Sequence, residues 1–150
     1  MLLGLWLGFM ATAFASLYAA PRPTDDPAAI VAWLRTSGAL GERATGRPLA
    51  FRMPASTCAC RDDDDDDEWS LARAALAEAA TGVVDLQTGE LRSDLPYELV
   101  VLDAGARLVY AGPLRLKGLC GGSDIGVARM LPGLLARSDT PFISASDCRC

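Results

Sequence analysis

Apolar residues return at helical spacing just after Asp26. Asp26 suits an N-cap, and Pro27 suits the first position of a helix because that position needs no backbone N–H donor. The pattern predicts a helix that runs to about Arg35 and is ended by Ser37-Gly38. Its apolar face consists of Ile30, Trp33 and Leu34.

Two short apolar runs flank a second helical pattern. Arg47 to Met53 and Val83 to Leu86 are each typical of a short strand. The pair Cys58-Ala59-Cys60 follows the first of these runs, so we expect both thiols on a turn from a strand to a helix. That helix is predicted to end at Thr81-Gly82. Its periodic residues are Trp69, Ala72, Leu76 and Ala79.

The clearest β pattern is a pair of apolar runs around a glycine-containing turn. Leu99 to Leu102 and Arg107 to Tyr110 flank Asp103-Ala104-Gly105 and predict a hairpin. The first run, Leu-Val-Val-Leu, is continuous, as expected for a strand buried on both faces. Gly112-Pro113 is expected to close the hairpin.

A last helical pattern follows Ser123 and Asp124, either of which suits an N-cap. Pro132 lies inside this pattern, so a kink or a break is expected there, because proline has no N–H to continue a helix. The periodic residues are Ile125, Ala128, Leu131 and Leu135.

The N-terminal segment, residues 1–20, carries no charged side chain and is just long enough to cross a hydrocarbon core of about 30 Å. Ala13-Phe14-Ala15 before Ser16 is compatible with signal cleavage, but the basic region of a signal peptide is missing. An uncleaved transmembrane anchor is therefore favoured over a signal segment. Residues 21–25 are expected to be a linker, and residues 26–150 a single α/β domain.

The acidity of the chain is local. The formal net charge is −5, and much of it comes from the run Asp62 to Asp67 with Glu68. Such a chain has little to neutralise phosphates, so nucleic acid is not an expected partner. The run is expected to be a solvated acidic loop or helix start, with weak Ca²⁺ or Mg²⁺ binding as the alternative. Its charge opposes ionisation of the thiols beside it.

Histidine is absent, which excludes Ser-His and Cys-His nucleophile pairs and every imidazole ligand. A thiol at a helix N-terminus meets the positive end of the helix dipole, which favours the reactive thiolate. With one residue between Cys58 and Cys60, a disulfide joining them closes a small ring and should be strained, which favours an oxidant or isomerase. The alternatives are buried thiols and structural bridges. The five cysteines are Cys58, Cys60, Cys120, Cys148 and Cys150.

Five groups of residues carry a family resemblance, which covers roughly residues 48–150. They are Thr57-Cys58-Ala59-Cys60, Leu99 to Pro113, Cys120-Gly121, Leu131-Pro132 and Cys148-x-Cys150. The order helix, strand, Cys-x-Cys turn, helix, strand, hairpin, helix is that of the thioredoxin fold. The chain resembles the bacterial thioredoxin-like superfamily, and within it a membrane-anchored family of domains of unknown function with a Cys-x-Cys motif. Ala59 replaces the proline expected between its cysteines.

The resemblance implies a thioredoxin-like fold with a central mixed sheet flanked by helices. It implies that Cys58 attacks a substrate and that Cys60 resolves the mixed disulfide. Pro96 stands where such proteins place a cis-proline, and Leu95 would then present its backbone to a bound thiol substrate. An ordinary proline before a strand is the alternative. Cys120, Cys148 and Cys150 are candidates for further redox partners or soft ligands, and also for structural roles.

Three functions follow from these observations. The first is a membrane-tethered thiol–disulfide oxidoreductase that acts on protein thiols or disulfides and uses neither a cofactor nor a metal. The second is a thiolate site for Cu(I) or Zn²⁺, since soft sulfur ligands select such metals. The third is a catalytically inert interaction domain. Redox-active cysteine pairs suit an oxidising compartment, so the soluble domain is expected in the periplasm, anchored to the inner membrane, or secreted if the segment is cleaved.

Overall fold

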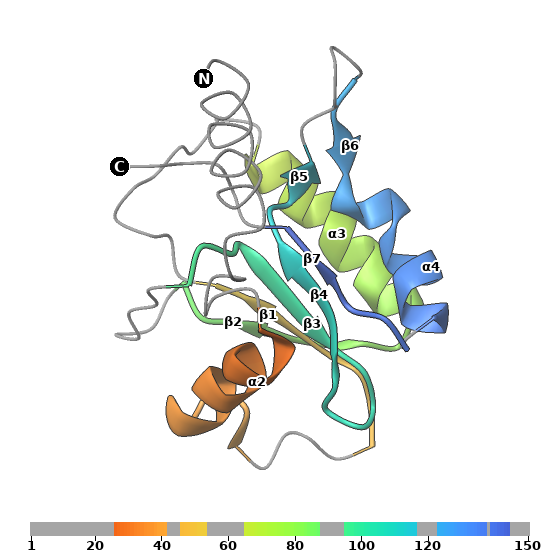
Figure 1. Ribbon diagram of the computed structural model, residues 1–150. Coiled ribbons are helices and arrows are strands. Elements are labelled where there is room, and N and C mark those ends of the chain that lie inside the picture. Colours follow the sequence, from red (N-terminus) through yellow and green to blue (C-terminus); the bar gives the residue numbers. More distant parts are fainter. Residues whose placement is uncertain are drawn as a thin grey trace, which may run out of the picture.

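The structure, a computed structural model, contains a mixed α/β domain with a five-stranded sheet between layers of helix (Figure 1). No helix in its described part is long and apolar enough to cross a membrane, and the anchor expected at residues 1–20 lies outside that part. The described residues are 26–41, 46–53, 65–87, 95–116, 123–137 and 139–144.

Helices and strands occur in mixed order along the chain. The helical elements are α2 (Pro27–Thr36), α3 (Asp65–Glu78), the 3₁₀ turn η4 (Val127–Arg129) and α4 (Leu131–Ala136). The strands are β1 (Leu49–Arg52), β2 (Gly82–Asp85), β3 (Leu99–Leu102), β4 (Leu108–Gly112), β5 (Arg115–Leu116), β6 (Ile125–Gly126) and β7 (Phe142–Ile143).

The main sheet has the strand order β2-β1-β3-β4-β7. β1 runs parallel to β2 and antiparallel to β3, β3 runs antiparallel to β4, and β4 runs parallel to β7. The connection from β1 to β2 contains α3, as parallel neighbours require a crossover. β5 and β6 pair as a separate two-stranded ribbon.

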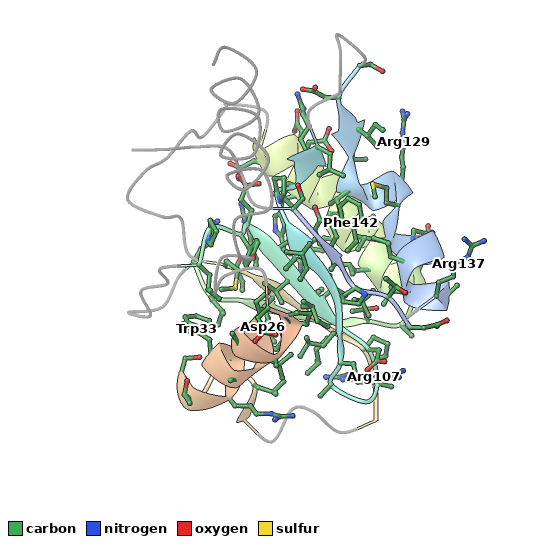
Figure 2. All side chains as sticks on the ribbon, viewed as in Figure 1. Asp26, Trp33, Arg107, Arg129, Arg137 and Phe142 are labelled. Atoms are coloured by element: carbon green, nitrogen blue, oxygen red, sulfur yellow. The ribbon has the colours of Figure 1, made fainter. Side chains whose placement is uncertain are left out.

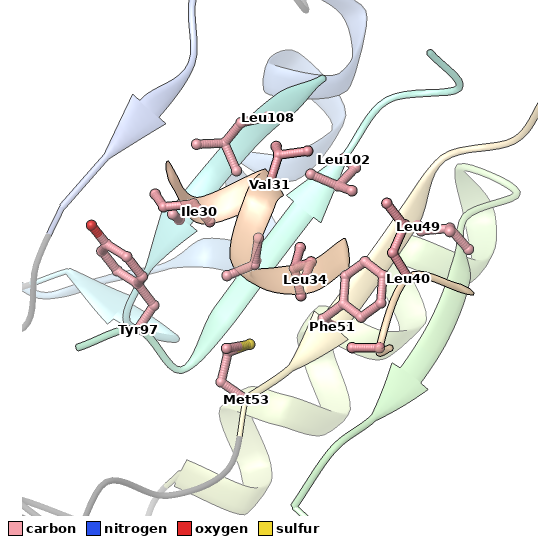
Figure 3. Packing of buried hydrophobic residues seen from close by; sticks show 13 residues of the cluster. Ile30, Val31, Leu34, Leu40, Leu49, Phe51, Met53, Tyr97, Leu102 and Leu108 are labelled. Carbon is pink, nitrogen blue, oxygen red and sulfur yellow. The ribbon is translucent and has the colours of Figure 1, made fainter. Parts of the chain in front are cut away.

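The first predicted helix is confirmed as α2. The Asp26 side chain accepts a hydrogen bond from the N–H of Ala28 at 3.0 Å, which satisfies one of the free donors at the helix start. Ile30 and Leu34 are fully buried against one face of the sheet (Figure 3). Trp33 is partly buried and packs against the same cluster.

The second predicted helix is also confirmed, and α3 begins at Asp65, four residues before Trp69. Trp69, Ala72 and Leu76 are buried, as the periodicity predicts. They pack on the sheet face opposite α2, the face that η4 and α4 also cover (Figure 1). The sheet is therefore covered by helix on both sides.

The predicted hairpin is confirmed as β3 and β4. All four residues of β3 are fully buried, because the strand is central and covered on both faces. The register shifts within the hairpin: Val101 pairs with Tyr110, whereas Leu102 pairs with Leu108. Val109 is thus the extra residue of a β-bulge, which places Val109 and Tyr110 in the same cluster on the α3 face.

The prediction of one helix after Asp124 is wrong at its start. Ile125 lies in β6 and is 45% exposed, so it does not belong to a buried helical face. The regular helix α4 begins at Leu131, with Pro132 in its first turn. The expected break occurs just before Pro132, because a proline fits the first turn, where its missing N–H has no helical acceptor.

Three strands were not predicted. β5, β6 and β7 have two residues each, too few for a period of two to be recognised. β7 forms one edge of the main sheet, where Phe142 and Ile143 pair with Tyr110 and Ala111 of β4. These short strands depend on a partner strand for their identity.

Candidate functional site

The predicted thiols lie outside the described residues. Cys58 and Cys60 fall in the sequence between β1, which ends at Arg52, and α3, which begins at Asp65. Cys120, Cys148 and Cys150 lie outside the described ranges as well. The structure describes the end of β1, where the chain leads into the Cys58–Cys60 segment, and the start of α3, which follows that segment.

The end of β1 is tied to the start of β3. The N–H of Met53 donates to the carbonyl of Glu98 at 2.8 Å, one residue before β3 begins. The N–H of Glu98 donates to the carbonyl of Gly112 at 3.1 Å, and its carboxylate accepts the N–H of Leu114 at 2.7 Å. These bonds link the C-terminal ends of β1 and β4 to the start of β3, at the end of the strands after which the cysteine segment follows in the sequence.

Leu95 and Pro96 precede β3 at this same end of the strands. Both are half-buried, and Leu95 packs against the cluster beneath α2. No peptide bond is cis among the described residues, so the Leu95–Pro96 bond is trans and the ordinary-proline alternative holds for its geometry. Their role in substrate binding stays a prediction.

Arg52 is the charged residue of β1 and is only 9% exposed. Its Nη2 lies 3.1 Å from Oδ1 of Asp66, in the first turn of α3. Its Nη1 lies 3.7 Å from Oδ2 of Asp85, the last residue of β2. A buried guanidinium needs such partners, because an unpaired charge loses far more solvation than the fold can replace.

The ring of Trp69 completes the surroundings of this guanidinium. The central carbon of the Arg52 guanidinium lies over the ring, 4.9 Å from the centroid, within the range of a cation–π contact. Nε of Arg52 is buried and has no hydrogen-bond acceptor in the part of the chain that the structure describes. One buried cation therefore joins β1, β2 and the start of α3. We call Arg52, Asp66, Trp69 and Asp85 the Arg52 cluster.

The described part of the acidic run forms the start of α3, as expected, and Asp66 and Asp67 are exposed, but two carboxylates of the run also form ion pairs. The Asp66 side chain is 76% exposed although it pairs with Arg52. Glu68 is 17% exposed and pairs with Arg115 of β5 at 3.2 Å. Asp67 is exposed, and residues 62–64 lie outside the described ranges. The end of the run thus fastens α3 to two strands instead of only facing water.

Arg52 was missed by the sequence analysis, although a signal for it exists. A single arginine interrupts an otherwise apolar strand, Leu49 to Met53, and a charge in such a strand must find partners or leave the core. The partners themselves, Asp66 and Asp85, are 14 and 33 positions away, so no local pattern identifies them.

No metal centre appears among the residues that the structure describes. No group of three or more acidic or sulfur ligands comes together there. An open hollow of about 810 Å³ lies beside α4 and includes Arg129 and Arg137 in its lining. Both arginine side chains project away from the body of the protein instead of toward each other (Figure 2). The hollow therefore lacks the convergent polar groups of a ligand site.

Comparison with known proteins adds no relative. No protein-family model matches the chain, and neither a curated protein nor a solved structure matches it. The thioredoxin-like family therefore stays a prediction. What the described residues show is a mixed α/β domain with a five-stranded mixed sheet, whose β1 and α3 flank the two cysteines of the Cys-x-Cys pair in the sequence.

Proposed function

We propose that the protein is a thiol–disulfide oxidoreductase that uses Cys58 and Cys60 to exchange disulfides with partner proteins. It has a thioredoxin-like domain tethered to a membrane by residues 1–20, with the domain in the periplasm. The strand order β2-β1-β3-β4, with β3 antiparallel to both of its neighbours, supports this fold because thioredoxin-like domains order their four central strands in this way.

The position of the pair between β1 and α3 is the observation that carries the proposal. α3 has 14 residues, enough turns for a substantial dipole, and its N-terminus follows the cysteines by a few residues. The positive end of a helix dipole favours a thiolate over a thiol, and the thiolate is the attacking species in exchange. Leu95 and Pro96 precede β3 at the end of the strands where β1 leads into the cysteine segment, and a partner's backbone is proposed to bind there.

The proposed reaction moves two electrons from a partner dithiol to the oxidised pair. A partner thiolate attacks Sγ of Cys58, which breaks the Cys58–Cys60 bond, forms a mixed disulfide and leaves Cys60 as a thiolate. The partner's second thiolate then attacks its own sulfur in the mixed disulfide and releases Cys58. The partner is now a disulfide, and the pair has taken up two electrons and, from water, two protons. Strain in the small ring favours this direction.

A redox titration with site-resolved mass spectrometry tests the proposal. The wild-type chain should show one reversible two-electron couple between Cys58 and Cys60. Cys58→Ser should abolish exchange, whereas reduced Cys60→Ser, offered the oxidised partner, should accumulate the mixed disulfide because the reverse reaction lacks its resolving thiol. The matched control, Cys148→Ser with Cys150→Ser, should keep the couple. Exchange that persists in Cys58→Ser, or a couple between Cys58 and a C-terminal cysteine, overturns the proposal.

A further inference from the structure

β2 is an edge strand that lacks the usual protection against pairing. It stands at one end of the strand order of the main sheet, and no other described strand lies on its outer side (Figure 1). Natural edge strands are often very short, or carry lysine, proline or a bulge, which keeps other chains from pairing with them. β7, at the opposite edge, has two residues, whereas β2 has four, Gly-Val-Val-Asp, in regular register with β1.

The backbone groups of Val83 and Asp85 point away from β1. The N–H groups of Gly82 and Leu86 each donate at 2.9 Å to a carbonyl of residues 48–52, so they point toward β1. Backbone N–H and C=O groups alternate between the two sides of a strand from one residue to the next. Val83 and Asp85 therefore present two donors and two acceptors on the outer side of β2.

The side chains along this edge change from basic to acidic. At the start of β2, the exposed Arg47 places its guanidinium carbon 3.2 Å from a Cβ added to Gly82, and it has no ion pair with another described residue. Val83 follows and is 36% exposed. At the end of β2, the side chains of Asp85 and Asp66 are 38% and 76% exposed and contact the same buried guanidinium.

We propose that the outer edge of β2 binds an extended segment of a partner protein as an added antiparallel strand. The segment carries a basic side chain opposite Asp85, an apolar one opposite Val83, and an acidic one opposite Gly82, beside Arg47. The residues opposite Asp85 and Val83 each exchange two hydrogen bonds with β2, since an antiparallel pair alternates bonded and non-bonded positions. Backbone bonds supply the affinity in such strand addition, and the alternate side chains supply the specificity.

A second copy of β2 fits this edge less well than such a segment. A two-fold axis at Val84 places Asp85 opposite Val83 of the other copy, and an axis at Val83 places Asp85 opposite Thr81. Both registers leave Asp85 without a cation opposite it. Like or missing charges across a strand pair lower its stability relative to a pair of opposite charges.

The test uses the peptide Thr-Lys-Ile-Val-Glu-Thr, with fluorescein on its N-terminus and an amidated C-terminus. Fluorescence anisotropy measures its binding to the full chain in reducing buffer. N-methylation of the Lys and Val amides, which face β2, should weaken binding by about tenfold, because two hydrogen bonds are lost. N-methylation of the Ile and Glu amides, which face away, should leave binding unchanged. Absence of binding by the probe, or equal effects of the two methylations, overturns the proposal.

Exchanging the two charges of the probe tests its direction. The peptide Thr-Glu-Ile-Val-Lys-Thr has the same composition, but as an antiparallel strand it places Glu opposite Asp85 and Lys beside Arg47. It should bind about threefold more weakly than the probe, the size of effect expected of exposed ion pairs. Equal or tighter binding would overturn the antiparallel arrangement, because this peptide matches the charges of β2 only as a parallel strand.

Two variants of the protein locate the site. Val83→Pro removes an N–H that β1 does not use, and it should abolish binding of the probe. Arg47→Glu should weaken binding of the probe about threefold and should bind Thr-Lys-Ile-Val-Lys-Thr more tightly than the wild type does. Arg47 is exposed, so this second variant carries the test if Val83→Pro does not fold. Unchanged binding in Arg47→Glu overturns the proposal.

A charge control and amide hydrogen exchange complete the design. Arg129→Glu changes the net charge as Arg47→Glu does, at a side chain that projects away from the protein on η4, and should leave binding unchanged (Figure 2). In the dilute free chain, the amides of Val83 and Asp85 should exchange faster than that of Leu86, and saturating probe should slow both. Slow exchange of both in the free chain would show that the edge is already covered, and would overturn the proposal.

The outcome is independent of the proposed redox function. Strand addition at β2 uses no cysteine, so replacing Cys58 with serine should leave binding of the probe unchanged. A chain without a Cys58–Cys60 couple that binds the probe as described would refute the oxidoreductase and keep the docking edge. A redox-active chain that does not bind the probe would do the reverse.

Discussion

The rings of Tyr110 and Phe142 stack in parallel, with centroids 5.9 Å apart and planes 5° apart. Phe142 belongs to the two-residue strand β7, and its partner in the register of β4 is Tyr110. Such a short edge strand has few backbone bonds to hold it, so the stacked pair fastens β7 to the sheet. The ring contact adds side-chain packing to the backbone pairing that makes β7 the fifth strand of the sheet.

Phe142→Ala should therefore lower the free energy of unfolding. The ring is 37% exposed, so we expect a loss of about 1.5 kcal/mol, below the cost of a fully buried phenylalanine. Phe142→Leu keeps most of the apolar area without the stack and should lose about half as much. Urea denaturation of the three proteins measures both values. Equal stability of all three would mean that the stack does not hold β7.

The Tyr110 hydroxyl should titrate late. It donates to the carbonyl of Pro113 at 2.5 Å, and burial together with the charge of Glu98 raises the pKa of Tyr110 well above its usual value. A raised folded-state pKa favours the neutral form, so this stabilisation is present below about pH 10 and is lost as the pH rises toward the folded-state pKa.

Absorbance of phenolate at 295 nm measures that titration. One tyrosine of the native chain should stay protonated above pH 10 and ionise together with unfolding, and this late step should vanish in Tyr110→Phe. The variant should also lose about 1 kcal/mol of stability near neutral pH, because the Pro113 carbonyl loses its donor. A late step that survives in Tyr110→Phe would assign it to another tyrosine.

Asp103 organises the turn between β3 and β4. Burial alone would raise its pKa, but hydrogen bonds from the N–H groups of Arg107 and Gly105 and from the Arg107 guanidinium outweigh burial and hold the pKa of Asp103 below its usual value. A depressed folded-state pKa contributes stability above the unfolded-state pKa of about 4, and this stability is lost as the pH falls through the folded-state pKa.

Asp103→Asn should therefore be less stable than the wild type at pH 7, by about 1 kcal/mol. The difference should narrow as the pH falls from the unfolded-state pKa of about 4 through the lower folded-state pKa, where the native wild-type carboxyl becomes protonated. Urea denaturation at pH 3, 4, 5 and 7 gives the two curves. Curves that run parallel across this range would show that the carboxylate form of Asp103 does not stabilise the turn.

Ala80 is held in a conformation that favours glycine. Its φ is +53°, and it follows α3 where the N–H of Thr81 donates to Leu76 and the N–H of Ala80 donates to Ala77. This bonding pattern is a Schellman cap, whose left-handed position costs a residue with a Cβ. Ala80→Gly should raise the free energy of unfolding by about 0.5 to 1 kcal/mol.

Two matched variants test that cause. Gly38, which has a φ of +75° after α2, has no atom within 4 Å of a Cβ added to it, so Gly38→Ala isolates the backbone strain and should destabilise by about 1 kcal/mol. Ala74→Gly, on the exposed side of α3, should also destabilise, because glycine weakens a helix interior. Stabilisation of Ala74→Gly would show that the gain at residue 80 is not conformational.

Helices and strands were predicted correctly where their signals, such as caps and apolar spacing, came from neighbouring residues. α2 begins at Asp26-Pro27, and α3 carries its buried face on Trp69, Ala72 and Leu76, as the spacing predicts. The run Leu99 to Leu102 is buried on both faces, as its unbroken apolar sequence predicts. The helix predicted from Ile125 fails because periodicity does not say whether a residue finds a strand partner, and Ile125 pairs with Leu116.

The candidate site also has features that the sequence predicts and features that only the folded chain shows. The cysteine pair and its place between a strand and a helix are visible in the sequence, since both depend on neighbours along the chain. The trans bond before Pro96, and the pairing of Glu68 with Arg115, are not visible there. The pairing depends on residues 47 positions apart, which only the packing of α3 against β5 brings together.

The sequence by itself determined the helices α2 and α3, the strands β1 to β4, and that any catalysis must do without histidine. Period and capping are properties of neighbouring residues, so they need no tertiary contact to be recognised. The tertiary structure alone decided the strand order, the bulge at Val109 and the partners of Arg52. A buried charge is tolerated only where distant carboxylates and a ring surround it, and folding alone assembles that arrangement.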